Sequence, residues 1–165
     1  MDAPVRVISE EEGYRLEETQ VPDGTMLELK VPILAEPSIE LAHKGLREYG
    51  FEQRFTITSM SQMGGTNPIW VYSVPEIEAS VELVPLIDFD QVQQKGFTYI
   101  DLPLLASWLE ETVGDHELAD GIRELLSQEE AFGKVLPFVK SLLQERVAAY
   151  RQCVADVKAE AVSSS

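Results

Sequence analysis

The sequence predicts an α+β domain with a mainly antiparallel sheet of about five strands, one helix over about residues 38–49 packed on that sheet, and a C-terminal group of about three helices. Hydrophobic residues alternate with polar ones through much of residues 1–95, as they do in half-buried strands. Over residues 100–160 they recur every three to four positions, as they do in helices. The chain length fits one domain over residues 1–160, followed by a frayed tail at 161–165.

Three strands are predicted before residue 40, each from apolar residues that would share one face. These residues are Val5 and Val7, then Tyr14 and Leu16, then Leu27, Leu29 and Val31. Between the second and third strands lies Val21-Pro22-Asp23-Gly24, in which proline presets a turn dihedral and glycine accepts a positive φ. The segment therefore predicts a hairpin connection.

The helix over about residues 38–49 is expected to begin after Ser38, because a serine hydroxyl can accept a hydrogen bond from the first helical turn. Gly50, followed by Phe51, is expected to end the helix in the left-handed conformation. Its apolar residues form one stripe, so we expect this helix to pack on a sheet.

Further strands are predicted at residues 55–59 and 69–74, which are rich in β-branched and aromatic residues. Residues 63–68 between them are expected to form a loop. Residues 81–87 are predicted to be a strand, which Pro85 places at a sheet edge or a bulge because proline cannot donate a ladder hydrogen bond. Two methionines near the loop, together with Trp70 and Tyr72, suit a contact patch for a partner. These methionines are Met60 and Met63.

The helical part is expected to hold three helices. Asp101 is the predicted N-cap of the first, which Gly114 ends, and Asp115 is the predicted N-cap of the second. The third is predicted over about residues 134–158, with Pro137 tolerated in its first turn. This last helix carries two adjacent apolar strips, which is wide enough to contact both its own core and another chain. We therefore expect that a homodimer can form through the C-terminal helix.

The net charge of −16 is concentrated in one region. Residues 76–130 contain fourteen acidic and two basic residues, whereas residues 41–75 and 131–165 are slightly basic. A concentrated negative field repels phosphate backbones and anionic lipids, so the composition argues against nucleic-acid or membrane partners. No uninterrupted apolar run approaches the length of a membrane span, about 18 residues, and we expect a cytoplasmic protein.

The same acidic region attracts basic protein surfaces. The sequence therefore suggests a non-catalytic interaction protein, such as an assembly factor, an adaptor or an inhibitor, that binds a basic partner. The residues expected to contact that partner are Glu110, Glu111, Asp115, Glu117 and Asp120. A more specific alternative is an immunity protein or antitoxin that neutralises a basic nuclease.

A different alternative is a small metal-dependent hydrolase or phosphatase. Asp88-Phe89-Asp90-Gln91-Val92 follows an apolar run and resembles the first motif of haloacid-dehalogenase-type phosphatases. The resemblance implies that Asp88 would be the nucleophile and Asp90 the acid and base. It also implies a later lysine, for which Lys134 or Lys140 is present, and a later acidic pair that helps to hold magnesium, whereas the helical part contains no adjacent Asp-Asp.

His116 and Asp120 offer a second metal-binding pattern, because residues four apart share one face of a helix. A zinc site needs a third protein ligand, and His43 is the remaining histidine. The N-terminus of the helix explains the same acidic residues without a metal, since it favours carboxylates. The sequence contains no complete set of catalytic residues, so it argues against an enzyme. We expect no catalytic residue, no metal site and no cofactor.

Overall fold

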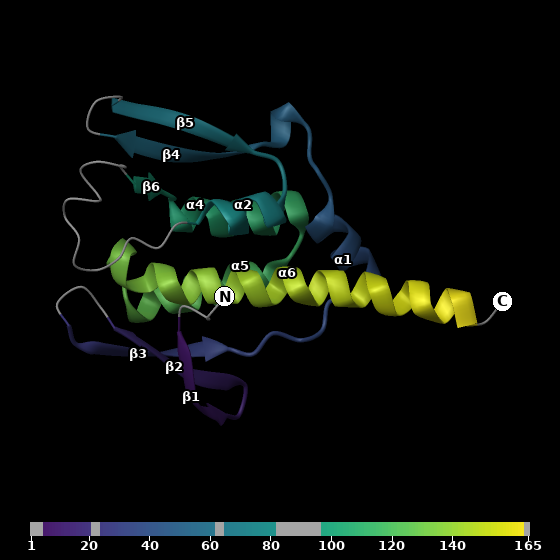
Figure 1. The fold of residues 1–165 in the computed structure, drawn as a ribbon, viewed down its shortest axis with the longest axis horizontal. Coiled ribbons are helices and arrows are strands. Elements are labelled where there is room, and N and C mark those ends of the chain that lie inside the picture. The colour runs from purple at the N-terminus through teal and green to yellow at the C-terminus, as the bar shows by residue number, and fades with distance from the viewer. Residues whose placement is uncertain (1–4, 21–23, 62–64, 82–96, 164–165) are drawn as a thin grey trace.

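The computed structural model describes residues 5–20, 24–61, 65–81 and 97–163. In these residues the chain forms two separate three-stranded antiparallel sheets and five α-helices, and the helices lie between the two sheets (Figure 1). The α+β composition agrees with the sequence. The prediction of one sheet of about five strands, with one helix on it and three helices after it, is wrong, because a layer of helices separates the two groups of strands.

The first sheet consists of β1 (Arg6–Glu11), β2 (Tyr14–Gln20) and β3 (Met26–Pro32), in that order. The inner face of β2 carries Glu17 and not the apolar residues Tyr14 and Leu16. Glu17 pairs with Leu29, so Glu17 shares the inner face with the buried residues Leu29 and Val31. Tyr14 and Leu16 therefore point to the outer face, because side chains alternate along a strand.

The second sheet consists of β4 (Phe55–Ser61), β5 (Gly65–Val71) and β6 (Phe97–Tyr99), in the order β5-β4-β6. β5 begins within the predicted loop, so residues 65–68 belong to a strand. The three-residue strand β6 lies where the sequence indicated a change to helices. The predicted strand at 81–87 falls almost entirely outside the described residues.

Helix α1 (Ile39–Leu46) begins as predicted, with the Ser38 hydroxyl accepting a 3.1 Å hydrogen bond from the Leu41 N–H. It ends three residues earlier than predicted, and Gly50 has an ordinary φ of −79° before the 3₁₀ turn η1 (Phe51–Gln53). The helix packs mainly on α6 and not on a sheet, with Gly45 directly against the ring of Tyr150. Without a Cβ, Gly45 allows this close approach.

Helix α2 (Val74–Ser80) was not predicted, because its apolar residues follow a β-rich segment. Ser73 caps its start: the Ser73 hydroxyl accepts from the Glu76 N–H at 3.2 Å, and the Glu76 carboxylate reaches back past the cap to accept from the Tyr72 N–H at 3.3 Å. The spacing of Val74, Ile77 and Val81 is helical, and these residues face the core.

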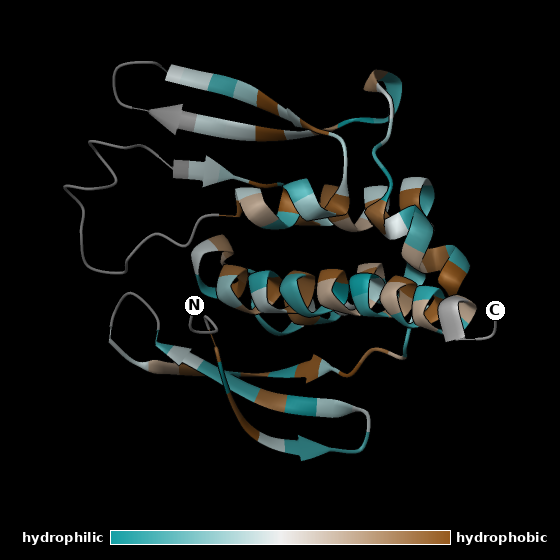
Figure 2. Ribbon diagram, turned by 45° about the vertical axis from the view of Figure 1, so that its right-hand side comes forward, coloured by the Kyte–Doolittle hydropathy of each residue, from teal (hydrophilic) through white to brown (hydrophobic). Residues whose placement is uncertain are grey.

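The remaining helices are α4 (Leu102–Trp108), the π-helical turn η2 (Leu109–Val113), α5 (His116–Gln128) and α6 (Phe132–Ser163). Their predicted caps are confirmed. Asp101 and Asp115 each accept an N-cap hydrogen bond of 3.1 Å, and Gly114 has the left-handed φ of 84°. Each helix alternates hydrophobic with hydrophilic residues (Figure 2), as expected for helices with one buried face.

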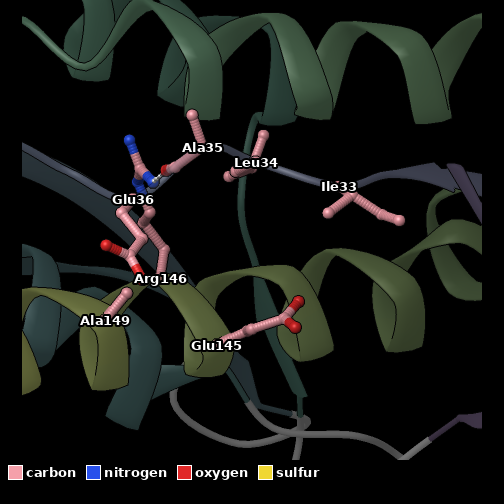
Figure 3. A pocket seen from close by; sticks show the side chains of 7 residues that line it. All are labelled: Ile33, Leu34, Ala35, Glu36, Glu145, Arg146 and Ala149. Carbon is pink, nitrogen blue, oxygen red and sulfur yellow. Dashed lines mark hydrogen bonds between the residues drawn. The ribbon is translucent and has the colours of Figure 1, made fainter. Parts of the chain in front are cut away.

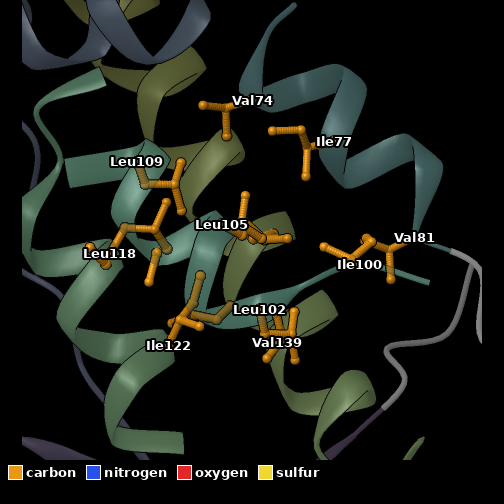
Figure 4. Packing of buried hydrophobic residues seen from close by; sticks show 14 of the residues in the cluster. Val74, Ile77, Val81, Ile100, Leu102, Leu105, Leu109, Leu118, Ile122 and Val139 are labelled. Carbon is orange, nitrogen blue, oxygen red and sulfur yellow. The ribbon is translucent and has the colours of Figure 1, made fainter. Parts of the chain in front are cut away.

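The core lies between these helices. Leu105 of α4, Leu118 and Ile122 of α5 and Val139 of α6 pack together with Ile77 of α2 (Figure 4). Both apolar strips of α6 are buried within the chain as far as Tyr150. Their buried residues are Val135, Leu136, Phe138, Val139, Leu142, Leu143, Val147 and Tyr150. This burial accounts for the wide apolar face without a second chain, so the homodimer stays a prediction.

The free sheet edges carry features that oppose pairing with other chains. A bulge between Val7 and Ser9 interrupts β1, and Pro68 lies within β5. The edge of β3 is covered by α5, because the Gln128 side-chain amide accepts from the Lys30 N–H at 2.8 Å and donates to the Lys30 carbonyl at 2.7 Å. Gln128 thus takes the hydrogen bonds that a neighbouring strand would make.

Replacing Gln128 with alanine should lower the free energy of unfolding by about 1–3 kcal/mol, since two hydrogen bonds of about 0.5–1.5 kcal/mol each are lost. Denaturant unfolding measures the change, and amide exchange at Lys30 reports the edge directly. Gln152→Ala is the control, because Gln152 is an exposed glutamine whose side chain, among the described residues, bonds only to Asp156 of α6, at 2.7 Å. Equal effects of the two substitutions would contradict the role of Gln128.

Candidate functional site

The acidic residues expected to bind a partner lie on η2 and α5. The N–H groups of Gly114 and Asp115 both donate to the Leu109 carbonyl, at 2.9 and 3.0 Å, which ends the π-helical turn and starts α5. Helix α5 buries Leu118, Ala119, Ile122 and Leu125. Its opposite side exposes Glu117, Asp120, Arg123 and Glu124.

Asp115 is fully buried and forms hydrogen bonds only inside the protein. Its carboxylate accepts from Arg146, with Nε at 2.7 Å from Oδ2 and Nη2 at 3.0 Å from Oδ1. The Tyr150 hydroxyl also donates to Oδ2, and the Leu118 N–H donates to Oδ1. Asp115 is therefore not accessible to a partner in this structure, and it instead joins the start of α5 to α6.

Two partners of Asp115, Tyr150 and Arg146, have raised pKa values. Burial raises the pKa of the Tyr150 hydroxyl, and the Asp115 carboxylate raises it further. Tyr150 therefore remains a hydrogen-bond donor. Burial lowers the pKa of Arg146, but hydrogen bonding and charge attraction to Asp115 outweigh burial and the pKa is raised, so the guanidinium stays charged.

Glu110, Asp120 and Arg123 form a surface cluster. Arg123 bonds to Glu110, and its Nη1 lies 3.1 Å from Oδ1 of Asp120. Glu117 makes a different contact: its carboxylate accepts from the Ala35 N–H at 2.9 Å, which ties α5 to the segment between β3 and α1. Among the five predicted residues, the structure thus brings Glu110 and Asp120 together. Glu111 is exposed beside them.

The surface remains strongly acidic despite these contacts. Between residues 109 and 130, seven carboxylates lie outside the core and Arg123 is the one Lys or Arg of the segment. The acidic face consists of the exposed residues Glu111, Glu117, Asp120 and Glu124. Glu124 was not among the predicted residues, although its spacing from Asp120 on the helix indicates the same side.

The predicted metal pattern is not assembled in the described residues. His116 lies 3.8 Å from Glu110, measured from Nδ1 to Oε1, while Asp120 bonds to Arg123. No group of three His, Cys, Asp or Glu side chains in the described ranges is placed to hold a metal ion. Asp88 and Asp90, the residues of the phosphatase-like motif, lie outside these ranges.

A pocket of about 170 Å³ lies between α6 and the segment that connects β3 to α1 (Figure 3). Arg146 forms part of its wall and donates from Nη1 to the Ala35 carbonyl at 2.7 Å, so all three of its nitrogens are bonded within the chain. Arg146 was not among the residues predicted from the sequence. Arg146 lies on an apolar strip of α6, between Leu143 and Val147. This position indicates a buried charge, and a buried charge needs a partner of opposite charge.

A second surface feature is a stacked group of Phe51, Arg54 and Trp70. The Arg54 guanidinium lies 3.9 Å from the ring centre of Phe51 and 5.2 Å from that of Trp70. Phe51 and Trp70 remain 53% and 47% exposed. Trp70 belongs both to this group and to the predicted contact patch. Of the other patch residues, Tyr72 is half-buried, and the side chains of Met60 and Met63 lie outside the described part of the structure.

Comparison with known proteins adds no relative. The chain matches no protein-family model, no curated protein and no solved structure. Within the described residues, no helix has both the length and the apolar character required to cross a membrane. The functional inference therefore rests on the residues and contacts given above.

Proposed function

We propose that this protein is a non-catalytic interaction protein, acting as an assembly factor, an adaptor or an inhibitor, and that it binds a basic partner protein through the acidic face. The excess of carboxylates over Arg123 on η2 and α5 is the observation that carries the proposal. Such a field speeds the encounter with a basic surface and selects among partners.

The rigidity of α5 supports this proposal. The helix is held by four buried apolar residues, by the Asp115 contacts at its start and by the Gln128 contacts at its end. The backbone positions of its exposed acidic residues are therefore fixed, which reduces the ordering cost of binding. Asp115 has no place in the contact surface, and its contribution to binding is to hold the helix.

The test compares two triple variants that raise the net charge equally. Glu111→Lys/Asp120→Lys/Glu124→Lys reverses the acidic face, and Glu40→Lys/Glu48→Lys/Glu52→Lys reverses exposed acids around α1 and η1. Tagged wild type and both variants are used to recover partners from the native cell extract at low and high salt, followed by mass spectrometry and binding measurement. The acidic-face variant should bind the basic partner at least about tenfold more weakly, since three exposed pairs of about 0.5 kcal/mol each are reversed.

High salt should release the partner from wild type, because exposed charges are screened. An equal loss of partner binding in both triple variants would mean that net charge alone determines binding, and it would contradict the proposal that the acidic face is the binding surface. A partner that proved to be a basic nuclease would favour the immunity or antitoxin alternative, which rescue from its toxicity then tests. Stoichiometric uptake of magnesium, manganese or zinc in calorimetry would instead favour the metal-dependent alternative.

A further inference from the structure

The β1–β2–β3 sheet meets α6 through a cluster of charged groups that the proposed function does not use. Arg15 and Glu17 lie on the face of β2 turned to α6, where they meet Ser141 and Glu145. The Glu17 residue is 1% exposed. Within the described residues, Asp115 is the only other buried carboxylate.

Glu17 is poorly paired for a buried carboxylate. Both terminal nitrogens of Arg15 donate to Glu145, one to each carboxylate oxygen. Glu17 keeps a long contact of 3.5 Å from the Ser141 hydroxyl to Oε1, and its Oε2 lies 3.7 Å from Arg15 Nε. Neither Oε2 nor Nε has a hydrogen-bond partner in the described part of the chain. An ionised Glu17 therefore lacks the hydrogen bonds that Asp115 has.

The surroundings favour the protonated form. The pKa of Glu17 is raised, and burial is the largest cause. The Glu145 charge raises the pKa further, whereas the Arg15 charge and the Ser141 hydrogen bond lower it. On β1, Glu10 is opposite Arg15 and adds negative charge. The charged residues of β3, which are Glu28 and Lys30, pair with residues of the outer face. On α6, Lys140 bonds to Glu78 and Arg146 bonds to Asp115.

We propose that the protonation state of Glu17 controls how firmly the β1–β2–β3 sheet is attached to α6. With Glu17 protonated, the Arg15–Glu145 pair leaves the cluster neutral, and the new O–H can donate to the Ser141 hydroxyl. With Glu17 ionised, an excess negative charge is buried beside Glu145. The sheet then separates from α6 more readily, because Glu17 regains water on separation.

The sign of the pH dependence follows from linkage. The attached state holds the proton of Glu17 to higher pH than the separated state, in which the pKa is about 4.3. Attachment is therefore strongest below about pH 4.3, weakens as the pH rises from there to the pKa of the attached state, and stays constant above it. This direction is opposite to that of a well-paired carboxylate such as a surface salt-bridge partner.

Amide hydrogen exchange tests the proposal, with the second sheet as an internal control. After correction for the intrinsic pH dependence of exchange, protection of β2 and β3 should fall across this interval, at no more than about tenfold per pH unit, the limiting slope for one linked proton. Protection of β4 and β5 should change little. A carbon-detected NMR titration of the Glu17 carboxylate locates the upper end of the interval independently.

Three substitutions separate Glu17 from other groups. Glu17→Gln should abolish the pH-dependent fall, whereas Glu18→Gln, on the outer face of the same strand, should leave it in place. Glu145→Gln should shift the upper end of the interval to lower pH, because it removes a like charge and frees the terminal nitrogens of Arg15 for Glu17. An unchanged fall in Glu17→Gln, an unshifted interval in Glu145→Gln, or an equal fall in both sheets would overturn the proposal.

Discussion

Asp115→Ala is expected to lower the free energy of unfolding by about 3–5 kcal/mol, because it leaves the buried Arg146 guanidinium without its counter-charge. The substitution removes two hydrogen bonds from Arg146, one from Tyr150 and the N-cap bond from Leu118. Within the described part of the chain, it also leaves Arg146 with only the Ala35 carbonyl as acceptor. Denaturant unfolding followed by circular dichroism measures the change.

Asp101→Ala provides the matched control for Asp115→Ala. Asp101 caps α4 with a hydrogen bond of the same length, 3.1 Å, but it is exposed and has no ion pair among the described residues. Asp101→Ala should lower the free energy of unfolding by only about 1 kcal/mol. The double variant Asp115→Leu/Arg146→Met should be more stable than Asp115→Ala, since removing both charges leaves no unpaired ion. Similar losses for Asp101→Ala and Asp115→Ala would show that capping alone explains the role of Asp115.

Gly45→Ala should destabilise the protein by about 1–3 kcal/mol through overpacking. A Cβ at Gly45 would overlap the ring of Tyr150, and the ring cannot retreat easily because its hydroxyl is bonded to the buried Asp115. The expected loss is net of the helix propensity gained by replacing glycine with alanine, about 1 kcal/mol. Thermal unfolding together with denaturant titration measures the effect.

Gly133→Ala is the corresponding control within α6, because a Cβ at this position meets no atom within 4 Å. It should be neutral or stabilise the protein by up to about 1 kcal/mol. A near-UV circular dichroism spectrum of Gly45→Ala should also change, since Tyr150 has to shift. If Gly45→Ala were as well tolerated as Gly133→Ala, the packing of α1 against α6 would have to be looser than the structure indicates.

The helix caps were the most predictable part of the fold. Ser38, Asp101 and Asp115 bond within three residues of themselves, and Gly114 adopts a backbone conformation that glycine favours. These interactions depend on nearby residues only. The hydrogen bonds of Ser73 and Glu76 at the start of α2 were equally local, but the β-rich residues before them concealed this start.

The candidate site was only partly predictable, because some of its contacts join residues that are far apart in the chain. The sequence located the concentration of acidic residues on η2 and α5, since charge can be counted. It did not indicate that Asp115 pairs with Arg146 thirty-one residues later, or that Arg123 joins Glu110 to Asp120. Helical spacing shows which residues share a side, and only the packed structure shows which of them are buried.

The sequence by itself determined the α+β composition, the regional negative charge and most helix starts, because these depend on composition and on contacts between near neighbours. Tertiary structure decided the division of the strands into two sheets, the burial of Glu17 in place of Leu16 and the partner of Asp115. Strand register and buried ion pairs join residues far apart in the chain. Their energies depend on desolvation by the whole fold, which no local pattern contains.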